Sequence, residues 1–286
     1  MTSEVITLPD GRRLSWHEFG APNGSPVIYT AGTPASGRYG GCYDQSARAA
    51  GLRWISPDKP GYGGSDYHRD RSLISWGDDL AALADQLGLD RFALAGESGG
   101  GPFTLAAAHR LSGRVSVVAL IASGGARPPS RAERAGQQAR IRFYGWLARN
   151  APAVNAVPFA VMRWSIATPA RLERSLRREM AAAPEQKHAD LRAEFEAVAD
   201  ALRQGTRGAV QEVAMTKRPW PFQLSEIKTP VHLWHGARDT NAPIANSRHL
   251  SRGLPNATLH VSDSSDHFVG QDRSDEITSV IASRVK

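Results

Sequence analysis

The sequence feature that most constrains the fold is a glycine-rich turn at residues 96–101, which reads Gly-Glu-Ser-Gly-Gly-Gly. A short apolar run at residues 92–95 precedes it, and a small-residue stretch at 99–111 with helical character follows it. A sharp strand-to-helix turn forces its central residue, Ser98, into a strained backbone conformation at the N-terminus of the helix. We expect glycine on both sides because the flanking backbones pass close to each other. The alternative is a packing turn without a chemical role.

Strand-like and helix-like segments alternate on both sides of this turn. Strands are expected at 4–8, 13–19, 26–31, 52–56, 92–95, 115–122, 231–235 and 258–261, and helices near 44–50, 73–87, 99–111, 242–252 and 272–284. Such alternation predicts an α/β fold with a mostly parallel sheet flanked by helices. Residues 127–221 are instead mostly helical. We therefore expect one core domain, residues 1–126 and 222–286, that is interrupted by a helical insertion at 127–221.

A serine hydroxyl is a weak nucleophile unless a base takes its proton and an acid orients the base. After a strand–turn–helix serine the expected chain order is serine, acid, histidine, with each residue following a strand. Asp239 follows the strand expected at 231–235, and His267 follows the last expected strand, so both are in position. Asp263 and Asp266 are rival acids because they lie close to His267 in the sequence. We interpret them as solvated loop charges.

Acyl transfer at a serine also needs hydrogen-bond donors for the developing oxyanion. The backbone N–H of Gly99, directly after the serine, is one candidate. The second donor should come from the loop after the strand expected at 26–31, which reads Gly-Thr-Pro at residues 32–34. Because Pro34 has no N–H, we select Thr33. The alternative is that this loop is only a flexible turn.

Together these residues resemble the α/β-hydrolase superfamily. Residues 58–66, which read Asp-Lys-Pro-Gly-Tyr-Gly-Gly-Ser-Asp, look like its D-x-x-G-x-G-x-S turn, and residues 233–236 look like the strand that precedes its acid. The resemblance implies the α/β-hydrolase fold, a triad of Ser98, Asp239 and His267, and a helical cap over the site.

Two positions depart from that family pattern. The loop that holds the oxyanion donor reads Ala31-Gly32, where the family usually has His-Gly. The loop before the catalytic histidine reads Ser-Ser-Asp-His at 264–267, where the family usually has Gly-x-Gly-His.

The nucleophile narrows the chemistry that the resemblance implies. Relatives that open epoxides or displace halides carry an aspartate at this turn, whereas this chain carries Ser98. The resemblance therefore implies a carboxylesterase-like hydrolase that cleaves an ester, thioester, lactone or amide through an acyl-serine intermediate, without cofactor or metal. One alternative uses the same site for C–C bond cleavage, a lyase step or acyl transfer. Another is a non-catalytic ligand-binding protein on the same fold.

The helical insertion carries the side chains that we expect to contact a substrate. We select Trp146, Phe159, Met162 and Trp164 as pocket candidates, and they suggest a small, partly apolar substrate. The alternative is that each of these side chains packs the insertion on itself and on the sheet.

Composition and charge argue against other classes of protein. The single cysteine, Cys42, excludes an intrachain disulfide framework and a multi-cysteine metal site. The net charge of +7 lies in the insertion, because residues 127–228 hold 18 Arg and Lys against 10 Asp and Glu, while the remainder holds 17 against 18. This placement argues against a nucleic-acid partner and suggests that a few arginines steer an anionic substrate.

The chain also lacks the segments that would direct it to a membrane. No apolar run of about 18 residues and no secretory signal is visible, which predicts a cytoplasmic protein without a membrane partner. The sequence leaves the oligomeric state open.

Overall fold

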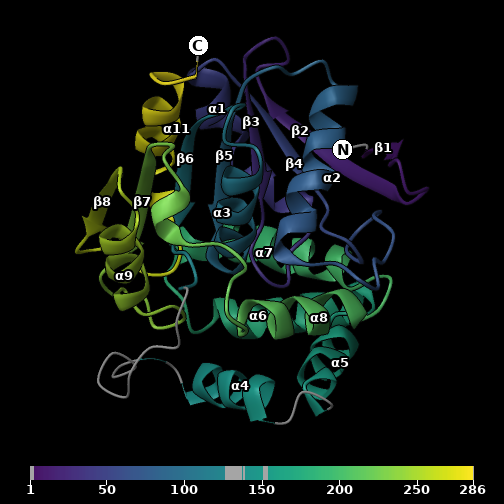
Figure 1. The fold of residues 1–286 in the computed structure, drawn as a ribbon. Coiled ribbons are helices and arrows are strands. Elements are labelled where there is room, and N and C mark those ends of the chain that lie inside the picture. The colour runs from purple at the N-terminus through teal and green to yellow at the C-terminus, as the bar shows by residue number, and fades with distance from the viewer. Residues whose placement is uncertain (1–2, 126–136, 138, 151–153, 286) are drawn as a thin grey trace.

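The computed structural model describes residues 3–125, 137, 139–150 and 154–285. In this part of the chain eight strands form one sheet in the order β1-β2-β4-β3-β5-β6-β7-β8 (Figure 1). The strands are β1 (Glu4–Thr7), β2 (Arg13–Gly20), β3 (Ser25–Thr30), β4 (Leu52–Pro57), β5 (Phe92–Glu97), β6 (Val115–Ile121), β7 (Val231–Gly236) and β8 (Ala257–Ser262).

All sheet neighbours from β4 to β8 pair in parallel, and β2 pairs antiparallel with both β1 and β4. The prediction of a mostly parallel sheet is therefore confirmed. The carboxyl ends of parallel strands meet at one edge of the sheet, so the loops after β3, β5, β7 and β8 lie at the same edge.

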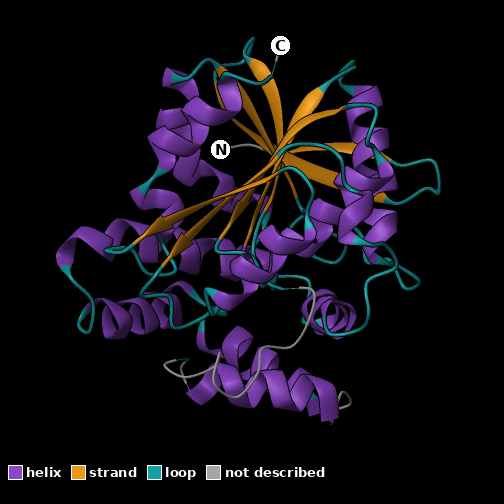
Figure 2. Cartoon of the chain, turned by 60° about the vertical axis from the view of Figure 1, so that its left-hand side comes forward, coloured by secondary structure: helices purple, strands orange, loops and turns teal. Residues whose placement is uncertain are grey.

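The sheet is covered by helices on both faces, as Figure 2 shows. Successive buried residues of a strand point to opposite faces. Ile28 and Leu94 accordingly pack with α2 (Leu73–Gln86) and α3 (Gly101–Arg110). Their neighbours Val27 and Ala93 pack on the other face with α1 (Asp44–Ala49) and α11 (Ser274–Ala282). This two-sided burial explains why the strands read as continuous apolar runs.

Helix α2 shows how local sequence defines an element. Ser72 caps its N-terminus by accepting a hydrogen bond from the Ser75 N–H, and the Ser75 hydroxyl accepts one from the Ser72 N–H. Leu73, Trp76 and Leu80 recur at helical spacing and are all buried against the sheet. The predicted range of 73–87 agrees with the observed helix to one residue.

The segment between β6 and β7 contains five described α-helices. They are α4 (Ala139–Asn150), α5 (Ala156–Ser165), α6 (Pro169–Met180), α7 (His188–Ala201) and α8 (Arg207–Thr216). We call α4–α8 the inserted helices. Figure 1 shows α6, α7 and α8 below the sheet, with α4 and α5 farther from it. The predicted start of the insertion, at residue 127, lies outside the described residues.

Three short elements were not predicted. Residues 37–43, expected to be a glycine-rich loop, form the 3-10 helix η1 (Gly37–Tyr43), and α7 packs against it. The short helix α10 (Val269–Asp272) precedes α11, and η5 (Leu224–Glu226) precedes β7. The remaining described α-helix, α9 (Ala245–Gly253), lies between β7 and β8, where a helix near 242–252 was expected. No helix in the described part of the chain is long and apolar enough to cross a membrane.

Candidate active site

Ser98 lies at the turn between β5 and α3 in a left-handed backbone conformation, with a φ of 50°. Few non-glycine residues adopt such a φ, and they concentrate at functional sites. The Ser98 carbonyl oxygen accepts a hydrogen bond from the Gly124 N–H, which anchors the turn to the residues after β6. The residue therefore has the strained backbone that the sequence predicted.

The structural reason for the flanking glycines differs from the expectation. A Cβ at Gly96 would collide with the side chain of Thr104 on α3, and a Cβ at Gly100 would collide with the carbonyl oxygen of Thr30 at the end of β3. The two glycines therefore make room for α3 and β3 rather than for each other. The turn is tight because a helix packs directly on two strands.

Ser98, His267 and Asp239 form a continuous chain of hydrogen bonds. The Ser98 Oγ lies 3.1 Å from the His267 Nε2, and the His267 Nδ1 lies 2.7 Å from the Asp239 Oδ2. The three residues follow β5, β8 and β7, whose carboxyl ends share one sheet edge. With a proton on Nδ1, the imidazole donates to Asp239, and its Nε2 can accept the proton of the Ser98 hydroxyl.

The Asp239 carboxylate is fixed on both of its oxygens. Its side chain is fully buried, and Oδ1 accepts hydrogen bonds from the backbone N–H groups of Asn241 at 2.7 Å and Ala242 at 2.8 Å. Oδ2 is left to face His267. The rival acids are placed differently, because Asp263 is exposed and Asp266 accepts a hydrogen bond from the Phe268 N–H.

The electrostatics of the pair favour a charged imidazole. Burial alone lowers the pKa of His267, but the hydrogen bond to Asp239 and the negative charges of Asp239, Glu194 and Glu97 outweigh it and raise the pKa to about 9. Burial alone raises the pKa of Asp239, but the hydrogen bond and charge of His267 leave it below its ordinary value. The site therefore stabilises the imidazolium that proton transfer from a serine would create.

The loop after β3 lies directly against Ser98. A Cβ at Gly32 would lie 3.2 Å from the Ser98 Cβ, and a Cβ at Gly99 would lie 3.2 Å from the Thr33 backbone nitrogen. The Thr33 and Gly99 residues selected from the sequence as oxyanion donors are thus neighbours beside the Ser98 hydroxyl. Whether their N–H groups hold an oxyanion stays a prediction.

The four pocket candidates have different environments. Trp146 and Trp164 are 53% and 63% exposed, and Trp164 stacks with the guanidinium of Arg171, 4.4 Å from its ring centre. Phe159 and Met162 are partly buried and pack among the inserted helices. These placements agree with the packing alternative for Phe159 and Met162, and contact of any of the four with a substrate stays a prediction.

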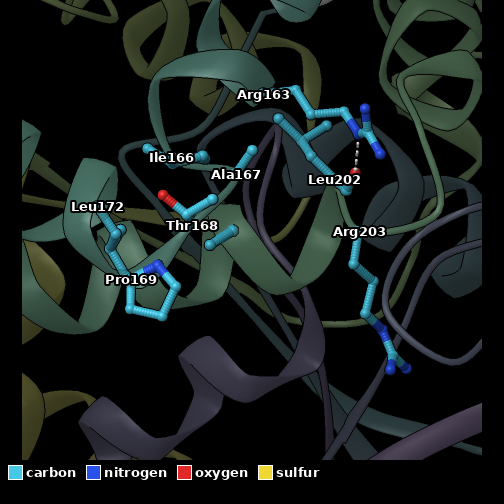
Figure 3. A pocket seen from close by; sticks show the side chains of 9 residues that line it. Arg163, Ile166, Ala167, Thr168, Pro169, Leu172, Leu202 and Arg203 are labelled. Atoms are coloured by element: carbon cyan, nitrogen blue, oxygen red, sulfur yellow. Dashed lines mark hydrogen bonds between the residues drawn. The ribbon is translucent and has the colours of Figure 1, made fainter.

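A cavity of about 370 Å³ lies among the inserted helices α5, α6 and α7. Its lining includes Arg163, Ile166, Leu172, Leu202 and Arg203. Figure 3 shows Arg163 turned toward the Leu202 carbonyl oxygen, to which its Nε donates at 2.9 Å. This cavity shares no residue with the Ser98–His267–Asp239 chain and contains none of the four pocket candidates.

Some described arginines in the segment between β6 and β7 have local partners. Arg192 pairs with Glu173, and Arg203 donates to the Gly63 carbonyl oxygen. The carboxylate of Glu194 on α7 is one charge from the inserted helices that acts on His267. Steering of an anionic substrate by the arginines stays a prediction.

One group of side chains in the described part of the chain has the composition of a metal site. Donor atoms of His17, Asp58 and Asp200 lie within 4.8 Å of one another. Asp58 is already engaged, because it accepts hydrogen bonds from the Ser15 hydroxyl at 2.5 Å and from the Gly37 and Gly64 N–H groups. It therefore serves the turn that follows β4.

Sequence reasoning missed two buried carboxylates beside the site. Glu97, to which no role was assigned, accepts hydrogen bonds from the hydroxyls of Tyr29 at 2.6 Å and Tyr43 at 2.9 Å. Glu212 of α8 pairs with Lys59 and Arg71. Lys59 belongs to the turn at 58–66 that resembles the family motif, but nothing in the sequence linked it to Glu212, 153 residues later.

Comparisons with known proteins agree with this architecture. The described fold is similar to that of an esterase from Exiguobacterium antarcticum, with a TM-score of 0.72, 19% identity and 99% of each chain covered. It is also similar to an enol-lactonase from Burkholderia xenovorans, with a TM-score of 0.69, 19% identity and 98% of each chain covered. At these identities the likeness shows the fold alone.

A curated relative and a family model extend the comparison to the sequence. The relative is the dihydrolipoyllysine-residue acetyltransferase component of the acetoin cleaving system of Pseudomonas putida, 35% identical over 121 residues. The match covers 40% of this chain and 31% of that protein, so this chain spans about a third of its length. A family model described as alpha/beta hydrolase fold matches residues 26–273. The chain therefore belongs to the α/β-hydrolase fold family.

Proposed function

We propose that the protein is a serine hydrolase that cleaves a carboxylic ester, thioester, lactone or amide through an acyl-serine intermediate at Ser98. The observation that carries this proposal is the hydrogen-bond chain from the Ser98 Oγ through His267 to Asp239, with distances of 3.1 and 2.7 Å. A left-handed serine at the start of a helix, a histidine base and a buried acid are the parts that such a reaction requires.

In the proposed reaction His267 takes the proton of Ser98 as the oxygen attacks the carbonyl carbon. Asp239 holds the Nδ1–H of the ring, so that Nε2 faces the serine and the imidazolium is stabilised. The N–H groups of Thr33 and Gly99 donate to the oxyanion. His267 then protonates the leaving group and activates a water molecule, which releases the acid and restores Ser98.

Two observations support an ester or lactone as the substrate and a cap over the site. Two of the similar structures are those of an esterase and an enol-lactonase. The inserted helices lie at the sheet edge that carries Ser98, where a cap would shape the pocket (Figure 1). We therefore propose an ester or lactone of modest size, with residues 127–221 as the cap.

Acyl transfer is the second candidate, because the curated relative with 35% identity is an acetyltransferase component. In that case an alcohol or thiol replaces water in the second half of the reaction and takes the acyl group from Ser98. Product analysis in the presence of an acceptor alcohol separates the two: a new ester as the main product supports transfer, and free acid supports hydrolysis.

A panel of p-nitrophenyl esters and simple lactones tests the proposal. Wild-type protein should release acid from at least one member at steady state, and Ser98→Ala should reduce kcat by about 10⁶-fold. Thr104→Ser, a small change behind the turn, provides a control that keeps the nucleophile. The absence of turnover on every member, or equal turnover by Ser98→Ala, would refute the proposal.

A further inference from the structure

A fully buried ionic cluster lies behind the loop that carries Thr33. The Lys59 Nζ is 2.6 Å from the Glu212 Oε1, and the Arg71 Nη2 is 3.0 Å from the Glu212 Oε2, with all three side chains at most 2% exposed. Placing charges in a protein interior is costly, and hydrophobic residues of the same volume often give equal or greater stability. The cluster therefore calls for a role other than stability alone.

Lys59 uses its remaining donors on the backbone of this loop. Its Nζ donates to the carbonyl oxygens of Ala31 at 2.8 Å and Gly32 at 3.0 Å, so all three ammonium protons are occupied. The Gly32 oxygen also accepts a hydrogen bond from the Ala35 N–H at 2.9 Å.

These contacts determine where the Thr33 N–H points. The Gly32 C=O and the Thr33 N–H belong to one planar trans peptide unit, in which the two groups point in opposite directions. Holding the Gly32 oxygen toward Lys59 therefore turns the Thr33 N–H away from Lys59. The same N–H group lies beside Gly99, next to the nucleophile.

Glu212 connects this loop to an inserted helix. It belongs to α8, and its Oε1 accepts hydrogen bonds from both the Thr33 hydroxyl and Lys59. The backbone of α8 lies directly on the turn after β4, because a Cβ at Gly208 would lie 2.9 Å from the Gly61 carbonyl oxygen. The Thr33 loop is thus held by one partner from the core and one from α8.

We propose that Lys59 and Glu212 are positioning residues. They orient the Thr33 N–H for oxyanion binding and make that orientation depend on how α8 packs against the core. Neither residue touches the reacting atoms. Lys59 fixes the Gly32–Thr33 peptide plane by its hydrogen bond to the Gly32 oxygen. Glu212 holds both Lys59 and the Thr33 side chain by accepting a hydrogen bond from each. If α8 moved away, Lys59 and Thr33 would lose a shared acceptor and the loop would lose its constraint. This inference rests on the proposed serine-hydrolase function.

The test compares binding of the transition state with binding of the substrate. Lys59→Met keeps the length and bulk of the side chain but removes the ammonium group. Thr33→Val keeps the backbone N–H but removes the hydroxyl that bonds to Glu212, and Thr33→Ser restores a hydroxyl. Arg207→Met is the matched control, since Arg207 is an exposed residue on the same helix as Glu212.

For Lys59→Met we expect kcat to fall about 10²-fold, the lower end of the effect of losing one oxyanion donor, with little change in KM. The affinity for a trifluoromethyl ketone, which forms a tetrahedral oxyanion with serine, should fall by the same factor. Thr33→Val should shift both quantities in the same direction, Thr33→Ser should recover most of the loss, and Arg207→Met should match the wild type. This pattern separates positioning from folding, because a partly unfolded enzyme loses active sites without losing ketone affinity at those that remain.

Two outcomes would overturn the inference. If the wild type turns over esters and both Lys59→Met and Thr33→Val keep its kcat and ketone affinity, the positioning role is refuted and the proposed function stands. A wild type that neither turns over esters nor binds the ketone would refute the proposed function, and this inference with it. If Lys59→Met does not fold, Thr33→Val and Thr33→Ser decide the question, because neither removes a buried charge.

Discussion

Replacing Asp239 by asparagine should inactivate the enzyme by imposing the wrong tautomer on His267. In the native structure Oδ1 accepts two backbone hydrogen bonds, at 2.7 and 2.8 Å, and Oδ2 faces the His267 Nδ1 at 2.7 Å. An asparagine that keeps its oxygen on the two N–H groups must turn its amide NH₂ toward Nδ1. The ring then carries its proton on Nε2, and it can no longer accept the proton of Ser98.

The magnitude follows from the cost of the opposite amide orientation. Turning the amide oxygen toward His267 would leave the Asn241 and Ala242 N–H groups unpaired in the interior, at about 1–3 kcal/mol each. The productive orientation is therefore disfavoured by about 2–6 kcal/mol, which corresponds to a fall in kcat of roughly 30-fold to 10⁴-fold. The upper end matches the loss of about 10⁴ known for this substitution in other serine triads.

The assay is kcat and KM for an activated ester in Asp239→Asn and Asp266→Asn. Asp266 is the matched control, because it is a nearby carboxylate with a 47% exposed side chain, which accepts a hydrogen bond from the Phe268 N–H and lies 3.7 Å from the Lys187 Nζ. Asp266→Asn should behave like the wild type. An Asp239→Asn enzyme within about threefold of wild-type kcat, and folded by circular dichroism, would refute the tautomer argument.

Four further predictions concern pH, the turn at Ser98 and the core. If His267 is the proposed base, it can take a proton only when neutral, so kcat/KM should rise with pH through a midpoint above 6.5 and toward 9. A midpoint below 6.5 would contradict the raised pKa of His267. Because its pKa is raised, the charged His267 stabilises the fold fully below pH 6.5, and this stabilisation is lost as the pH rises through about 9. Denaturant titrations at several pH values measure this loss. Gly99→Ala would place a Cβ against the Thr33 hydroxyl and should lower kcat by about 10²–10³-fold. An unchanged kcat would show that Thr33 is not held beside Gly99. Trp54→Ala should reduce the free energy of unfolding by about 3–5 kcal/mol, because the Trp54 ring is fully buried and stacks on Tyr43 with ring centroids 4.8 Å apart. A reduction below about 1 kcal/mol in urea titrations would refute this prediction.

The parts of the site that sequence could predict are those set by local rules. Ser98, Asp239 and His267 each follow a strand directly, and the carboxyl ends of parallel strands share an edge. Strand placement and chain order were therefore sufficient to bring the three together. Helix α2 was predictable for a similar reason, since its apolar spacing and its cap lie within a single segment.

The parts that sequence could not predict depend on contacts between distant segments. The neighbour of Gly96 is Thr104, whose position depends on how α3 packs on β5. Lys59 and Glu212 meet across 153 residues, and nothing local to either residue marks the other as its partner. The exposure of Trp164 likewise depends on how the inserted helices pack. From sequence alone, a tryptophan in an apolar helix is expected to be buried.

In the proposed reaction Ser98 carries the acyl group during turnover. The most direct test is mass spectrometry of the protein quenched in acid during reaction with a p-nitrophenyl ester, followed by peptide mapping. We expect one acyl group per chain, located on the peptide that contains Ser98. This acyl group should accumulate in the wild type and be absent in Ser98→Ala. Steady turnover with no acyl group on that peptide, or with the acyl group on another residue, would contradict an acyl-serine intermediate at Ser98.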